Sequence, residues 1–161
     1  MPDVLLSWIA LRHGLRAAVL ACLFAAAGAM AGGAAVWLWS EARPAQASSI
    51  IERVPAIPAG AVARARDSID HGPWVLTALA GAVSNRPFKL YAAAAPHAGI
   101  ALPAFVAATP LIRLPRFLLV SLAFAGLGAV LRRRLPPRAA TVLFAAGWTL
   151  FYAAFWLLSP W

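Results

Sequence analysis

One apolar run near the start of the chain constrains its fold more than any other feature. The residues from Ala17 to Trp39 include no charged side chain, and Arg12 and Arg16 lie just before them. At the helical rise the run is about 34 Å long, enough to cross a hydrocarbon core of about 30 Å. A cleavable signal peptide is the alternative, because Ala45-Gln46-Ala47 resembles a cleavage site. Signal-peptide apolar regions are only about 7–15 residues long, so we predict a membrane anchor over 17–39.

The amino-acid composition is typical of an integral membrane protein. Hydrophobic residues make up 63% and charged residues only 12%, whereas soluble domains are closer to half apolar and a quarter charged. The net charge of +9 comes from arginines that flank apolar runs, which is typical of loops at a membrane and does not indicate a nucleic-acid partner. Cys22 is the one cysteine, so the chain holds no internal disulfide. These features predict an all-α integral membrane protein.

Small residues within the first run predict close helix packing. Gly28 and Gly32 form a GxxxG pattern, with Gly33 directly after it. Small residues four apart let two helix backbones approach closely. A homodimer through the Gly28/Gly32 face is therefore one candidate partner.

A polar interval from Ser40 to Gly72 follows the first run. Pro55 and Pro58 break its first half, and residues 59–71 have a helical pattern. In such a helix Val62, Ala65 and Ile69 share one face, and Arg66 and Asp70 have the spacing of an ion pair on the other. We predict a short amphipathic helix at the membrane interface.

The segment 73–99 combines apolar and charged residues in a way that opposes a full span. Two apolar stretches enclose Ser84-Asn85-Arg86-Pro87-Phe88-Lys89. Charges at the middle of a span cost about 2.5–3.5 kcal/mol each on insertion scales, and Pro87 disfavours helix at Arg86. We predict a re-entrant hairpin that turns at Asn85 and Pro87.

The positions of the arginines also support the re-entrant hairpin, because they require an even number of membrane crossings between residue 16 and residue 132. A second span is expected over 102–131, which ends at the arginines 132–134, and a third over 139–158. If Arg12 and Arg16 mark the cytoplasmic side, the arginine triplet should lie there too. The segment 73–99 must then not cross. The predicted topology is multi-pass in a bacterial inner membrane, with the N-terminus cytoplasmic and the C-terminus outside.

Arg113 and Arg116 interrupt the second span near its predicted outer end. One interpretation is that both side chains snorkel to the headgroup region. The other is that they bind an anionic headgroup, since guanidinium groups match phosphate oxygens.

Three stretches resemble a known family. Gly81-Ala-Val-Ser-Asn-Arg-Pro-Phe-Lys-Leu-Tyr-Ala-Ala-Ala-Ala-Pro-His-Ala-Gly99 is similar to a proline-aromatic-lysine turn, Arg113-Leu-Pro-Arg116-Phe-Leu-Leu-Val to paired arginines before an apolar helix, and Met1-Pro-Asp-Val-Leu-Leu6 to the end of a first re-entrant hairpin. In this order they resemble the DedA / SNARE-associated (VTT-domain) membrane proteins, in particular the YqaA-like branch. The likeness covers about residues 2–134.

The resemblance implies a function and a set of site residues. Members are linked to the movement of polyprenyl phosphates or phospholipids between leaflets and to envelope homeostasis. The acidic limb usual before Asp3 is missing, so either the start of the chain is assigned too late or this is a shortened member. Asp3 is the remaining candidate for a proton-coupling acid. Only Lys89, with neighbouring Arg86, matches the basic residues of the second hairpin.

We therefore expect Arg86 and Lys89 to hold an anionic headgroup at mid-membrane, and Arg113 and Arg116 to receive it at the outer mouth. A non-transporting structural or assembly subunit is the alternative. An enzyme is the least favoured class, because His13, His71 and His97 are scattered and Ser84 has no visible base. No catalytic residue, metal site or cofactor is expected.

Overall fold

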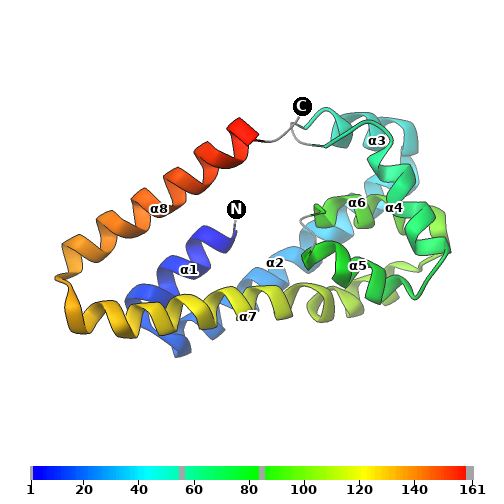
Figure 1. Ribbon diagram of the computed structural model, residues 1–161. Coiled ribbons are helices and arrows are strands. Elements are labelled where there is room, and N and C mark those ends of the chain that lie inside the picture. Colours follow the sequence, from blue (N-terminus) through cyan, green and yellow to red (C-terminus); the bar gives the residue numbers. More distant parts are fainter. Residues whose placement is uncertain (1, 55–56, 84–85, 159–161) are drawn as a thin grey trace. The chain divides into compact units, whose positions relative to one another are not determined.

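The computed structural model describes residues 2–54, 57–83 and 86–158. These residues form helices joined by turns, with no strand among them (Figure 1). The elements are α1 (Pro2–His13), α2 (Leu15–Ala42), α3 (Pro44–Glu52), α4 (Ala61–Asp70), α5 (Trp74–Val83), α6 (Phe88–Ala94), the 3₁₀ turn η1 (Pro96–Ala98), α7 (Leu102–Arg134) and α8 (Pro137–Leu158). The predicted all-α class is confirmed.

Three helices are long and apolar enough to cross a membrane. The stretches are Leu15–Ala42 in α2, Leu102–Leu131 in α7 and Arg138–Leu157 in α8, and they coincide with the three predicted spans. Many of their large apolar side chains point outward; Phe24, for example, is 79% exposed. Exposure of such an apolar surface to water costs free energy, whereas exposure to the hydrocarbon of a bilayer does not. The three helices are consistent with a membrane protein.

The described residues fall into two compact units. Those of 1–24 and 117–161 form the terminal unit, and those of 25–116 form the central unit.

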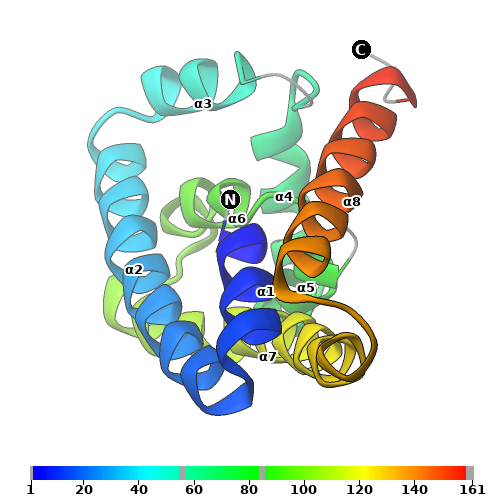
Figure 2. The same cartoon turned by 90° about the vertical axis from the view of Figure 1, so that its left-hand side faces the viewer.

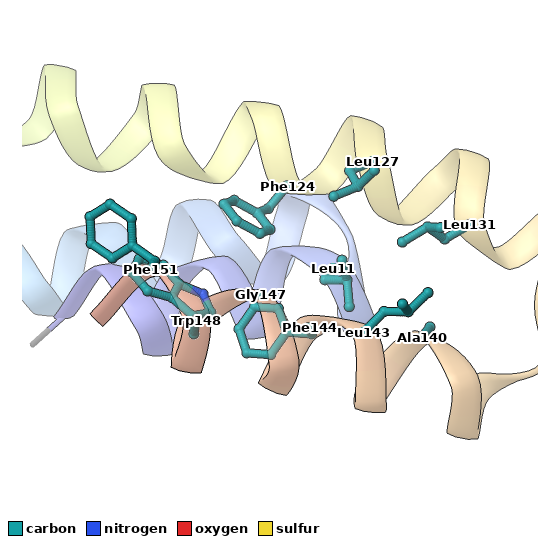
Figure 3. A pocket seen from close by; sticks show the side chains of 10 residues that line it. All are labelled: Leu11, Phe124, Leu127, Leu131, Ala140, Leu143, Phe144, Gly147, Trp148 and Phe151. Carbon is teal, nitrogen blue, oxygen red and sulfur yellow. The ribbon is translucent and has the colours of Figure 1, made fainter. Parts of the chain in front are cut away.

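In the terminal unit α1 packs antiparallel against α8 (Figures 1 and 2). The ring centroids of Trp8 and Phe144 are 5.1 Å apart, and Trp148 Nε1 donates to Ser7 Oγ over 3.2 Å. The ring of Phe124, from α7, lies edge-on to Phe144, as the close view in Figure 3 shows. Aromatic pairs of this kind add about 0.5–1.5 kcal/mol beyond simple burial.

The first residues of the chain belong to a longer helix than the sequence suggested. Residues 2–6, expected as the end of a re-entrant hairpin, are the first half of α1. This helix ends at Gly14, whose φ of +82° lies in the left-handed region that glycine adopts without strain. Further along, α1 meets α7 closely, because a Cβ on Gly128 would lie 2.9 Å from the Leu11 Cα.

In the central unit the short helix α6 forms the core. Leu90, Tyr91 and the alanines 92–95 are each at most 5% exposed, and α3, α4 and α5 all contact this helix. Four consecutive alanines let several neighbours approach at once. This burial explains why the small-residue stretch follows the predicted turn.

Helix α4 matches the predicted helix at 59–71, but its apolar face has a different neighbour from the one expected. Val62, Ala65 and Ile69 are buried within the core that includes α6. Protein therefore covers the face that was expected to lie in the membrane interface. The predicted pair of Arg66 and Asp70 is present, with Nε and Oδ2 3.6 Å apart.

Helix α3 and the uninterrupted course of helix α7 were not predicted. Helix α3 forms in the polar interval because Pro44 is tolerated at a helix start and Ala47 and Ile51 bury one face. Helix α7 continues unbroken through Pro110 and Pro115.

Candidate functional site

The candidate site surrounds the hairpin formed by α5 and α6. The two helices have 10 and 7 residues, or about 15 and 10 Å, so neither could cross a core of about 30 Å. They contact each other. The predicted break is therefore present, with Lys89 placed in the first turn of α6. Asn85 lies outside the described residues.

Pro87 determines where helix α6 begins. Pro87 has extended backbone angles (φ −60°, ψ 128°) and precedes the first helical residue, Phe88. The residue before a proline disfavours the helical region, so α5 cannot continue through Arg86. The Arg86 N–H instead donates to the Gly81 carbonyl over 2.9 Å, which caps the end of α5.

The two limbs of the hairpin close on each other at Gly81 and Tyr91. Tyr91 is 2% exposed, and its phenol ring and hydroxyl fill the space that a Cβ on Gly81 would need. Helices α5 and α6 can pack this closely at Gly81 and Tyr91 only because residue 81 lacks a side chain.

We expect Gly81→Ala to destabilise the protein by about 1–3 kcal/mol, because the added methyl overlaps a buried ring that cannot swing away. Gly28→Ala is the matched control, since nothing lies within 4 Å of its Cβ position and alanine favours a helix by about 0.5–1 kcal/mol. Thermal unfolding in detergent measures both. Equal melting temperatures for the two variants would show that the limbs are not closed as described.

A cavity of about 310 Å³ lies beside the turn and is lined by two arginines. Arg86 comes from the turn itself, and Arg64 comes from α4; Pro87, Leu90 and Ala65 are among the other lining residues. Two arginines at one cavity make it a candidate anion site, because a guanidinium group can offer several donors to phosphate oxygens.

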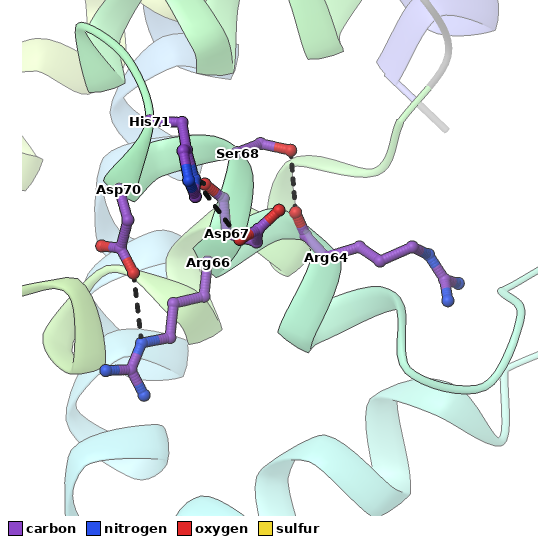
Figure 4. A network of polar contacts seen from close by, with 6 residues as sticks. All are labelled: Arg64, Arg66, Asp67, Ser68, Asp70 and His71. Carbon is purple, nitrogen blue, oxygen red and sulfur yellow. Dashed lines mark hydrogen bonds and ion pairs between the residues drawn. The ribbon is translucent and has the colours of Figure 1, made fainter.

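The acidic residues of α4 are engaged with other partners (Figure 4). Arg66 pairs with Asp70, and His71 Nδ1 lies 3.3 Å from Asp67 Oδ1. The Asp67 backbone carbonyl and, next, its carboxylate raise the pKa of His71 above its ordinary value. In the described part of the chain Arg64 takes part in neither pair, so its charge remains available to the cavity.

One of the other predicted headgroup residues, Arg113 of α7, contacts the first residue of α6. The Arg113 guanidinium lies over the Phe88 ring, 5.4 Å from its centroid. Lys89 follows Phe88 and is half-buried, as is Arg116, three residues beyond Arg113. These three cations are not among the residues that line the cavity of Arg64 and Arg86. The structure thus brings Arg113 to the hairpin, and of the four predicted residues Arg86 lines the cavity beside the turn.

The exit of the hairpin is fastened to α2 by a histidine. His97 Nε2 donates to the Ser40 carbonyl over 3.2 Å, and the Ser40 hydroxyl donates to the Ala93 carbonyl over 2.8 Å. Trp37, one turn earlier in α2, donates to the Ile100 carbonyl over 3.1 Å. His97 therefore has a structural role at the closing end of the hairpin.

The remaining predicted residues lie elsewhere. Asp3 is half-buried in α1, close enough to Tyr152 for an electrostatic interaction; proton coupling through it stays a prediction. Gly28 and Gly32 are exposed with open space beside them. Among the described residues no group of three His, Cys, Asp or Glu side chains could hold a metal ion.

No family model, curated protein or solved structure matches this chain. The DedA resemblance therefore stands on the three quoted sequence stretches. Sequence reasoning missed Arg64, because its partner in the cavity is 22 positions away. The signal that could have found it is the charged face of the 59–71 helix, opposite Val62, Ala65 and Ile69.

Proposed function

We propose that this protein moves an anionic lipid, a polyprenyl phosphate or a phospholipid, between membrane leaflets in the manner expected of DedA-type proteins. The observation that carries the proposal is the cavity at the hairpin turn, where Arg64 and Arg86 meet. A phosphate would bind there by charge-assisted hydrogen bonds, while its apolar tail stays in lipid.

The contacts of the hairpin suggest how deep this site lies. The Phe88 ring packs beside Gly33 of α2, six residues before Trp39, or about 9 Å at helical rise. Trp39 is expected at the outer interface, where aromatic residues gather. The hairpin would then dip about a third of the way into a core of about 30 Å, a shallower position than mid-membrane.

A shallow site changes the roles of the basic residues. Arg64 and Arg86 would receive the headgroup near the outer face. Arg113, held over Phe88, would be the next cation that the headgroup meets, with Lys89 beside it. This arrangement fits a bacterial inner membrane in which the N-terminus is cytoplasmic and the C-terminus outside.

A translocation assay tests the proposal. The purified protein is reconstituted into vesicles that carry a fluorescent phosphatidylglycerol or polyprenyl phosphate, and a membrane-impermeant reductant bleaches the outer leaflet. We expect bleaching to pass the level of protein-free vesicles, because label from the inner leaflet reaches the reductant. Bleaching that stops at that level, with the protein inserted, would support the alternative of a structural or assembly subunit.

A further inference from the structure

A second candidate lipid site lies in the terminal unit, in a groove between α1, α7 and α8. The groove has a volume of about 570 Å³, and its walls are apolar side chains such as Leu11, Phe124, Leu143 and Phe151 (Figure 3). Trp148 also lines it, but its Nε1 already donates to Ser7. The groove therefore suits a hydrocarbon chain and offers few polar groups to water.

One end of this groove opens on basic residues. A second cavity, of about 420 Å³, shares Leu11, Leu131 and Ala140 with the first and adds Arg12 and His13 to its lining. Arg12 and His13 are both exposed at this end. A ligand that extends from the first cavity into the second would have an apolar part and an anionic part.

The Arg12 guanidinium is held in place there. Its Nη1 lies 3.5 Å from Thr141 Oγ1, and its Cζ lies 5.3 Å from the centroid of the Trp8 ring. No acidic side chain pairs with Arg12 in the part of the chain that the structure describes. A fixed cation without an acidic partner favours a phosphate, because little side-chain freedom is lost on binding.

The charge of the terminal unit is concentrated near this end. By position in the chain, Arg12 and Arg16 flank the turn between α1 and α2, and Arg138 with the arginines 132–134 flanks the turn between α7 and α8. The contact between Arg12 and Thr141 brings these two turns together. The one acidic residue of the unit, Asp3, lies in the first turn of α1. The field at this end therefore attracts anions.

The length of the groove matches one leaflet. From Ala140 to Phe151 along α8 the distance is about 16 Å at helical rise, close to half of a core of about 30 Å. We infer that the groove binds an anionic glycerophospholipid from the leaflet at the basic end of the unit. One acyl chain fills the apolar cavity, and the phosphate contacts Arg12. This site does not depend on lipid translocation at the hairpin.

Gly147 allows the groove to be filled without disturbing the helices. It lines the groove, and nothing lies within 4 Å of its Cβ position. Gly147→Leu should occupy the space of the acyl chain. Gly126→Leu is the matched control, because Gly126 also has open space but is not among the lining residues. Arg12→Gln removes the charge at the mouth, and Arg43→Gln removes one from an exposed arginine of the central unit that lines neither cavity.

Native mass spectrometry of the detergent-purified full chain, with equal amounts of phosphatidylglycerol and phosphatidylcholine of the same acyl chains, tests the site. We expect one phosphatidylglycerol to be retained about tenfold more than phosphatidylcholine. Gly147→Leu should remove this adduct, and Arg12→Gln should abolish the preference, while both control variants behave as the unchanged chain. Inorganic phosphate should compete poorly, because it lacks the apolar part.

Three outcomes would overturn the inference. Equal retention of the two lipids, unaffected by Gly147→Leu, would mean ordinary lipid at the protein surface. A lipid-free dimer that Gly147→Leu dissociates would make the groove an interface between copies. Full competition by inorganic phosphate would leave the acyl groove without a role. A failed translocation assay has no bearing on any of these measurements.

Discussion

Replacement of both Arg64 and Arg86 by glutamine is expected to reduce lipid translocation by at least about tenfold, because each guanidinium supplies charge-assisted hydrogen bonds worth about 1.5–3 kcal/mol. Each single variant should lose less, since the other arginine still faces the cavity. The rate of leaflet exchange in reconstituted vesicles measures the effect.

The matched control removes the same charge from positions outside the cavity. Arg43 and Arg53 are both exposed, and neither lines the cavity beside the turn. Arg43→Gln with Arg53→Gln should retain translocation. If the two double variants were equally impaired, net charge rather than the cavity would explain the loss. Melting temperatures near that of the unchanged protein would exclude unfolding as the cause.

Gly128→Ala is expected to cause the largest loss of stability among the single substitutions considered. The Cβ would lie 2.9 Å from the Leu11 Cα, and a backbone, unlike a flexible side chain, cannot rotate away. Overpacking of this kind costs about 1–3 kcal/mol, occasionally more. The free energy of unfolding in detergent, or the melting temperature, measures it.

Gly126→Ala tests the same substitution two residues earlier in α7. Nothing lies within 4 Å of its Cβ position, so the variant should be neutral or slightly stabilised by the higher helix propensity of alanine. A stable Gly128→Ala variant would contradict the close approach of α1 and α7.

The helices were largely predictable because lipid imposes a length and an apolar composition on anything that spans it. The three long helices contain runs that the sequence marks directly, and Pro87 with its charged neighbours marks the break between α5 and α6. Helix α3 was missed because its stability comes from the burial of Ala47 and Ile51, the second of which packs in the core. This is a tertiary effect that the polar sequence of the helix does not show.

The site was predictable only in part, because its residues come from separate elements. Arg86 was identified from its place in a proline turn, and Arg113 from its unusual position in an apolar helix. Arg64 could not be assigned, since a charged helix face looks the same whether it meets water or a cavity. The apolar face of α4 was interpreted as lipid-facing for a similar reason. An amphipathic pattern identifies the buried face but not what buries it.

Cysteine labelling on either side of the hairpin tests most directly whether the chain enters the bilayer at α5 and α6 and returns to the same face. Single cysteines at Gly72 and Ala101, which flank the hairpin and are exposed, are introduced into a Cys22→Ser chain and treated with a membrane-impermeant maleimide. Both should react from the outside of intact cells, whereas a cysteine at His13 should react only in inverted vesicles. Reaction of positions 72 and 101 from opposite sides would show that the segment crosses the membrane.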